Sequence, residues 1–133
     1  MKARLKATGL TTILALAISV AGATHSQGKQ AISTSLSECS VIFVELAEVG
    51  LRRNKPQDSV EKISATASAF FKEAILQAQR EGRAAPKDYV AAEYHRLLDK
   101  WQGRFGKITY LSENKDWVDY CRALGKSRKI PLP

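Results

Sequence analysis

Residue types that build common active sites are scarce in this chain. Among its 133 residues are two histidines, one methionine and two cysteines. It has no Gly-x-Ser-x-Gly, no phosphate-binding glycine loop, no His-Glu-x-x-His and no Cys-x-x-Cys. These are the motifs of α/β-hydrolases, P-loop proteins, zinc proteases and dithiol oxidoreductases. A Cys-x-x-Cys-His site for covalent c-type haem is also missing. We therefore predict no catalytic residue, no metal site and no cofactor.

The two histidines offer one weak candidate for chemistry. His25 lies in a polar segment, whereas His95 precedes Asp99 by four residues on a predicted helix, so these two share a face. Such a pair suits a metal or an acid–base dyad, but it equally suits a solvated histidine beside an aspartate. Two ligands fall short of the three or four that zinc needs. An enzyme of unrecognised type that uses Glu93, His95 or Asp99 is the last of three hypotheses.

Long, uninterrupted apolar runs are also absent. Leu10 to Val20 is apolar but is diluted by threonine and serine, and it is shorter than the roughly 20 residues of a membrane span. Three basic residues precede this run, and Ala21-Gly22-Ala23 follows it. This order predicts a secretory signal peptide over residues 1–23, cut after Ala23, and hence a periplasmic or secreted protein. An uncleaved membrane anchor is the alternative.

Basic residues exceed acidic ones, 21 against 13. Three of them leave with the signal peptide, so 21 less 3, against 13, gives the mature chain a net charge of +5. That charge mildly favours anionic surfaces such as lipid headgroups or acidic polysaccharides. About 110 residues remain, enough for one domain. We expect a flexible lead over 24–33, a helical domain over 34–125 and a basic tail over 126–133, where two prolines prevent a regular helix.

Both cysteines, Cys39 and Cys121, remain after cleavage. An even number in an exported chain predicts a disulfide. Two buried thiols or a reactive pair are the alternatives, but a nucleophilic Cys39 needs a base that no pattern supplies. Closing a loop of roughly 80 residues stabilises a chain by about 4–5 kcal/mol on chain-entropy grounds.

Apolar residues recur at helical spacing in four segments. Capping boxes at Ser35-Leu36-Ser37-Glu38 and Asp58-Ser59-Val60-Glu61 predict where the first two helices begin. Gly50 and Gly82 predict where they end. The Ala-rich run from Ala65 to Ala78 predicts that a neighbouring helix can approach closely.

A third helix begins at Pro86, and its apolar face extends to Phe105. A short fourth helix is capped by Ser112 or Asn114 and ends at Gly125. Between them, 108–111 alternates briefly, which we interpret as a frayed helix end or a packed linker.

Short links between four helices predict an all-α up-down bundle, with either four helices or three long ones and a short one. In such a bundle the start of the first helix, where Cys39 lies, and the end of the last helix, where Cys121 lies, share one pole, so a bridge between the two cysteines is allowed. An irregular three-helix packing with the fourth laid across its end is the alternative.

Seven aromatic residues fall mostly on the inward stripes of these helices. They suit a ligand pocket between helices, but apolar periodicity already explains them as core. They are Phe70, Phe71, Tyr94, Trp101, Phe105, Trp117 and Tyr120.

The predicted bundle gathers basic residues at one end. There the turn between the second and third helices, the end of the fourth helix and the start of the first helix meet. We name this set the basic pole: Arg80, Arg83, Lys87, Arg122, Lys126, Arg128 and Lys129. It suits an anionic membrane, a cell-wall polymer or an acidic protein. Alternatively, these residues only complement helix C-termini and keep the surface soluble. A smaller basic spot, Arg52-Arg53-Lys55, lies at the opposite end.

These observations predict an exported, non-enzymatic helical protein that binds a protein partner or an anionic envelope component. Export makes nucleic acid an unexpected partner. The second hypothesis is a periplasmic chaperone or stress protein, because the layout resembles that of small acid-stress chaperones, although no motif matches.

Overall fold

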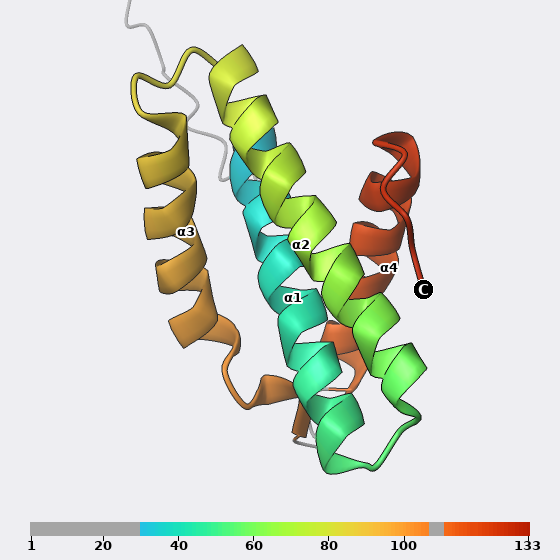
Figure 1. Cartoon of the computed structure of the whole chain (residues 1–133). Coiled ribbons are helices and arrows are strands. Elements are labelled where there is room, and N and C mark those ends of the chain that lie inside the picture. Colours follow the sequence, from blue (N-terminus) through green and yellow to red (C-terminus); the bar gives the residue numbers. More distant parts are fainter. Residues whose placement is uncertain (1–29, 107–110) are drawn as a thin grey trace, which may run out of the picture.

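The computed structural model describes residues 30–106 and 111–133, apart from the side chain of Leu111. Within them it contains α1 (Ile32–Arg52), α2 (Gln57–Arg80), α3 (Pro86–Trp101), a short 3₁₀ helix η2 (Arg104–Gly106) and α4 (Leu111–Ser127). Successive α-helices alternate in direction (Figure 1), and the described residues form no strand. The predicted all-α up-down bundle is confirmed.

Several sequence predictions lie outside the described residues. They are the signal peptide over 1–23 with its cut after Ala23, His25, most of the lead, and the brief alternation at Ile108 and Tyr110. The last residues of the expected lead, 30–33, are described and lead into α1. None of the helices that the structure describes is long and apolar enough to span a membrane.

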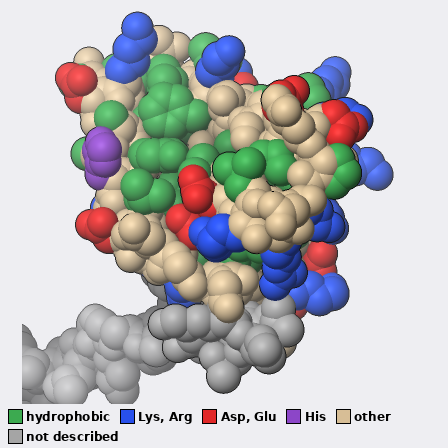
Figure 2. Space-filling view, turned by 60° about the horizontal axis from the view of Figure 1, so that its bottom comes forward, with side chains coloured by type: hydrophobic (Ala, Val, Ile, Leu, Met, Phe, Trp, Pro, Cys, Tyr) green, Lys and Arg blue, Asp and Glu red, His purple; other side chains and the backbone are tan. Residues whose placement is uncertain are grey.

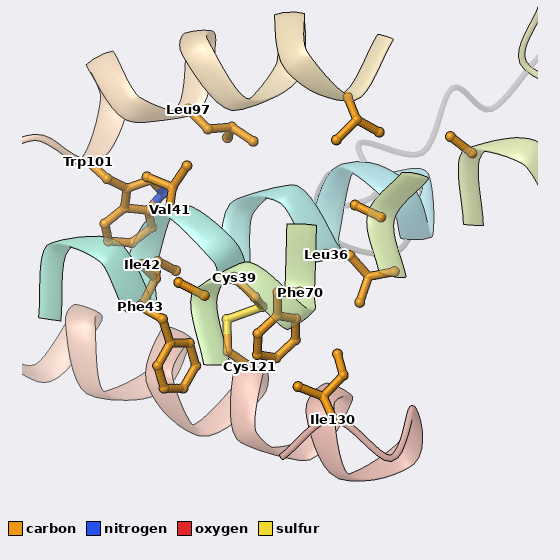
Figure 3. Packing of buried hydrophobic residues seen from close by; sticks show 14 of the residues in the cluster. Leu36, Cys39, Val41, Ile42, Phe43, Phe70, Leu97, Trp101, Cys121 and Ile130 are labelled. Atoms are coloured by element: carbon orange, nitrogen blue, oxygen red, sulfur yellow. A yellow bond between two sulfur atoms is a disulfide. The ribbon is translucent and has the colours of Figure 1, made fainter. Parts of the chain in front are cut away.

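α1 is the central helix of the bundle. It packs along α2 and lies between α3 on one side and α4 on the other (Figures 1 and 3). Its inward residues are fully buried, and Phe43 stacks on Phe70 of α2 with ring centroids 5.5 Å apart. Neighbours on three sides also bury the serines and threonine of its first half. The core therefore surrounds α1, whereas in a symmetric four-helix bundle it would lie on the axis between four equivalent helices.

A disulfide joins α1 to α4, as the sequence predicts. The Cα atoms of Cys39 and Cys121 are 5.4 Å apart, and the S–S bond is 2.10 Å. Both sulfurs lie in the buried core beside Phe70 (Figure 3). The bridge crosses 82 positions of sequence and ties the first helix to the last.

The predicted capping box at Ser35 is wrong, because α1 already begins at Ile32 and its N-cap residue, Ala31, has no side chain that can cap. Instead Glu81, just after α2, accepts hydrogen bonds from the Ser33 N–H at 3.0 Å and the Ser33 hydroxyl at 2.5 Å. A carboxylate just beyond the end of another helix thus satisfies an N–H group that the start of α1 leaves free.

Glu38, the last residue of that expected box, does not reach back to its own helix start. It is 0% exposed and accepts hydrogen bonds from the Trp101 Nε1 at 2.8 Å and the Lys100 Nζ at 2.6 Å. The Gln30 Nε2 donates to its other oxygen at 3.2 Å. Glu38 therefore fastens α1 to the end of α3.

The second expected capping box, Asp58 to Glu61, is also wrong, because the helix begins before it. α2 begins at Gln57 after Pro56 and has no side-chain cap. The side-chain amide of Gln57 donates to the Glu61 carboxylate at 2.8 Å. The predicted end of α2 is confirmed: Gly82 has φ +75°. Its N–H and that of Arg83 donate to the Gln79 and Ala78 carbonyls, which is the glycine-terminated Schellman motif.

Gly50 and Gly125 do not end their helices, contrary to prediction. α1 continues to Arg52 and α4 to Ser127. A Cβ at Gly50 would lie 3.2 Å from Val60, and a Cβ at Gly125 would lie 2.9 Å from both Phe70 and Leu132. These glycines allow neighbouring side chains to pack against the helix backbone.

The end of the chain packs against the bundle. Lys129 adopts φ +56°, and the Ile130 N–H donates to the Gly125 carbonyl at 2.9 Å, which turns the chain back at the end of α4. Ile130 is buried in the core, and the Thr66 hydroxyl of α2 donates to the Pro131 carbonyl at 2.8 Å. The chain end thus runs back beside α4 (Figure 1).

The region between α3 and α4 also differs from expectation. α3 begins at Pro86 as predicted but ends at Trp101, and Phe105 lies buried in η2 rather than on α3. α4 already begins at Leu111, so neither Ser112 nor Asn114 precedes it as a cap. Asn114 is buried and donates to the Arg104 carbonyl at 3.2 Å.

Candidate binding groove

An open groove of about 620 Å³ lies between α1, α2 and the middle of α3. Most of its wall is carbon. The lining residues are Ser40, Val44, Ala47, Glu48 and Leu51 of α1, Ser64, Ala67, Ser68, Phe71 and Lys72 of α2, and Ala91, Tyr94 and His95 of α3. Figure 2 shows hydrophobic side chains gathered beside the purple histidine on this face of the molecule.

The floor of the groove follows from the small residues where α1 and α2 meet. The Ser40 hydroxyl donates to the Ala67 carbonyl at 2.8 Å, so the two backbones approach closely without bulky side chains between them. This confirms the close approach that the Ala-rich run predicts. Ser64 and Ser68 line the same strip one helical turn apart. Short side chains at these positions leave volume that a larger residue would fill.

Two aromatic residues close the groove where α2 meets α3. Phe71 and Tyr94 meet edge to face, with ring centroids 5.5 Å apart. Burial raises the pKa of the Tyr94 phenol, and the nearby negative charge of Glu45 raises it further. The phenol therefore stays neutral at physiological pH, and Tyr94 contributes an apolar ring with one hydroxyl.

Charged residues lie along the rim of the groove. Lys72 and His95 line it from α2 and α3, whereas Glu48 lies on α1 and pairs with Arg52 at 3.8 Å. Leu51 is the last α1 residue in the wall and is 59% exposed. The exposed basic spot follows it directly, with Arg52 as the last residue of α1 and Arg53 and Lys55 in the link to α2. One end of the groove therefore opens beside positive charge.

The basic pole is partly neutralised by acidic side chains. Arg80 and Arg128 come together around Glu73, whose Oε1 is 2.8 Å and 3.8 Å from their Nη1 atoms, and both donate to the Gln77 side-chain oxygen. Arg83 lies 3.9 Å from Glu81 and stacks over Tyr89, 4.2 Å from the ring centroid.

The four remaining members of the basic pole make no ion pair with any residue that the structure describes. These are Lys87, Arg122, Lys126 and Lys129. None of the seven lines the groove. The pole and the groove are therefore separate surfaces, and the smaller basic spot is the one that adjoins the apolar groove.

The histidine–aspartate candidate is not assembled by the fold. His95 packs its ring against Tyr94, with centroids 6.2 Å apart, and no hydrogen bond or ion pair joins it to Asp99. Glu93 instead pairs with Arg96 at 2.8 Å. Among the described residues, no three of the His, Cys, Asp and Glu side chains lie close enough together to hold a metal ion.

The aromatic residues divide between core and surface. Phe70 and Trp101 are fully buried and Phe105 nearly so, which agrees with their interpretation as core. Phe71 and Tyr94 are half-buried and line the groove instead. The serines of the groove floor were not predicted as site residues. Their spacing of four residues, at Ser64 and Ser68, is the signal that could have pointed to an unfilled strip.

The chain was compared with known proteins in three ways: neither the family models, nor the curated proteins, nor the solved structures include a match.

Proposed function

We propose that this chain is an exported, non-enzymatic binding protein whose groove holds the alkyl chain of an anionic amphiphile of the cell envelope. The observation that carries the proposal is an apolar groove that opens beside exposed basic residues. Its volume of about 620 Å³ falls within the roughly 300–1,000 Å³ typical of small-molecule sites. Such sites are largely apolar, with few polar groups that fix orientation.

The choice of an anionic head rests on charge. Leu51 ends the apolar wall, and Arg53 and Lys55 follow it, both exposed and without an ion pair among the described residues. Lys72 and His95 add positive or protonatable groups along the rim. Among the described lining residues the one acidic side chain is that of Glu48, which pairs with Arg52. A carboxylate or phosphate head at this end is therefore attracted, whereas a cationic head is repelled.

Export is supported by the disulfide, because such bonds persist mainly in oxidising compartments such as the periplasm. Together with the predicted signal peptide, it supports the proposal of an exported protein, which would meet envelope lipids and their breakdown products. A protein partner that inserts an apolar segment into the same groove is the alternative.

The test is a chain-length series. Octanoate, decanoate and dodecanoate are titrated into the oxidised protein by calorimetry, below their micelle concentrations. Each buried CH₂ contributes about 0.8 kcal/mol, so affinity should rise about fifteenfold for every two carbons. Replacing Arg53 and Lys55 with Gln should weaken dodecanoate binding and leave dodecanol binding unchanged. Affinity that does not depend on chain length contradicts the proposal.

A matched pair of variants locates the binding. Ser68→Phe places a ring in the groove from an exposed position of α2, and should abolish dodecanoate binding. Ala65→Phe adds the same ring at an exposed position of the same helix outside the groove, and should bind as the native protein does. Equal affinities of the two variants would place the ligand elsewhere.

A further inference from the structure

A second pocket, of about 300 Å³, lies where α4 meets the start of α1. None of its residues lines the groove. They are Gln30 and Ser35 on the α1 side, and Glu113, Asp116, Trp117 and Tyr120 on α4. The four α4 residues have the spacing of one helix face, so α4 presents two carboxylates and two aromatic rings to the same space.

The lining attracts positive charge. The lining residues that the structure describes include no Lys, Arg or His. Asp116 makes no ion pair with any described residue, and Glu113 has only a long contact, 3.7 Å, with Arg104. Within this small space the two carboxylates are therefore only weakly compensated, which favours a cationic ligand.

The rings of the pocket are suited to the same charge. Trp117 and Tyr120 meet edge to face with centroids 5.6 Å apart, and Tyr120 is 45% exposed. The Lys100 Nζ lies 5.1 Å from the Trp117 ring centroid. One cation of the protein itself thus already lies against this indole, as the negative face of an aromatic ring favours.

Ser35 provides an independent indication of a ligand. It is 6% exposed and lines the pocket, yet its hydroxyl makes no hydrogen bond with any described residue. The neighbouring hydroxyls of Ser33, Ser37 and Ser40 all have partners. The Ser35 oxygen is not one of the fully buried atoms that lack a partner, so it is open to the pocket and available to a group that enters it.

From this lining we infer that the pocket binds a primary alkylammonium group. The hydroxyl oxygen of Ser35, the amide oxygen of Gln30 and the two carboxylates can accept its N–H bonds. The alkyl stem then lies against Trp117 and Tyr120. A quaternary ammonium lacks N–H donors and leaves Ser35 unpaired. The ammonium belongs either to a free alkyl amine or to a lysine side chain of a peptide.

The experiment uses calorimetry and tryptophan fluorescence on the oxidised full chain. Its probes are 1,5-diaminopentane, N-acetyl-lysine amide and the neutral 1,5-pentanediol. Saturable binding of either amine with none of the diol supports the site. Stronger binding of the diamine identifies a free amine, and stronger binding of the lysine amide identifies a side chain. The absence of saturable amine binding, or equal binding of the diol, overturns the inference.

Variants locate the ammonium. Asp116→Asn and Ser35→Ala should each weaken amine binding, Asp116→Asn by about tenfold or more, because hydrogen bonds to charged groups are the stronger ones. Asp119→Asn removes a charge from the same helix outside the pocket and should leave the affinity unchanged. An equal loss in Asp116→Asn and Asp119→Asn would indicate unspecific charge attraction and contradict the site. The Ser68→Phe variant should still bind amines, so the two sites fail independently.

Discussion

Gly125 is a residue whose lack of a side chain the packing requires. Replacing a helical glycine with alanine ordinarily stabilises a helix by about 1 kcal/mol. Here the new Cβ would lie 2.9 Å from the Phe70 Cζ, and this ring is fully buried and cannot retreat. We expect Gly125→Ala to lower the free energy of unfolding by about 1–3 kcal/mol, as overpacking does. Urea unfolding measures it, and Gly106→Ala, whose Cβ meets nothing within 4 Å, serves as the neutral control.

Glu38 is the buried charge on which the junction of α1 and α3 depends. Glu38→Ala leaves the Trp101 N–H and the Lys100 ammonium without their acceptor. Breaking such a buried pair costs about 3–5 kcal/mol, with a smaller loss here because Lys100 is 42% exposed and can turn to solvent. Glu38→Gln keeps an oxygen for Trp101 and should lose less. Equal unfolding free energies for Glu38→Ala and the native protein would show that this junction contributes nothing.

At the scale of elements, α1 depends on α2 for its first turn. Desolvation alone would raise the pKa of Glu81, but hydrogen bonds from the Ser33 hydroxyl and N–H and from Gln77, with the charge of Arg83, outweigh it and lower the pKa below its ordinary 4.5. The ionised form therefore favours the folded state. Its stabilisation is complete above the ordinary pKa and is lost as pH falls through the lowered value.

We therefore expect Glu81→Gln to flatten the acid side of the stability curve. The difference in unfolding free energy between the native protein and the variant should be constant at neutral pH and shrink below about pH 4.5. Urea unfolding at pH 3 to 7 measures this. The Arg96 hydrogen bond also lowers the pKa of Glu93, but Glu93 contributes equally to the pH dependence of stability in both proteins and cancels in the difference. A difference that grows on acidification would mean that the Glu81 carboxylate does not cap α1.

The starts and ends of the helices show which boundaries can be predicted from local sequence alone. Pro86 and Gly82 were predicted correctly, because a fixed φ and a positive φ are properties of the residue itself. The start of α1 was not, since its cap, Glu81, comes from 48 positions away. The same holds for Gly50 and Gly125, where the determining contact is made by another segment. Capping rules consider only residues close to a helix end in sequence, so they miss contacts from other segments.

For the whole molecule, the disulfide is the largest single constraint. Cys39→Ala together with Cys121→Ala should lower the free energy of unfolding by about 4–5 kcal/mol, because the bridge spans 82 positions and restricts the unfolded chain. Urea unfolding with and without reductant measures the effect, and reductant should not alter the double variant. An unchanged unfolding midpoint of the native protein after complete reduction would contradict this.

The helices, their alternating direction and the disulfide could be predicted from the sequence. The periodic spacing of apolar residues indicates the helices, the short links indicate their alternation, and the even number of cysteines indicates the bridge. The groove could not be predicted. It exists because Ser64 and Ser68 are too short to fill the space between α1, α2 and α3, and packing volume is a property of three helices together. The pocket beside Ser35 likewise needs α4 placed against α1, which only the folded chain brings about.

The central position of α1 has a consequence for the order of events during synthesis. The ribosome makes this helix first among the four, yet Cys121, the partner of its Cys39, follows 82 positions later. At roughly 5–20 residues per second, α1 waits about 4–16 seconds before its last neighbour exists. During that time α2 can already pack on α1, but the Cys39 thiol has no partner, so the bridge can close only after α4 has been made.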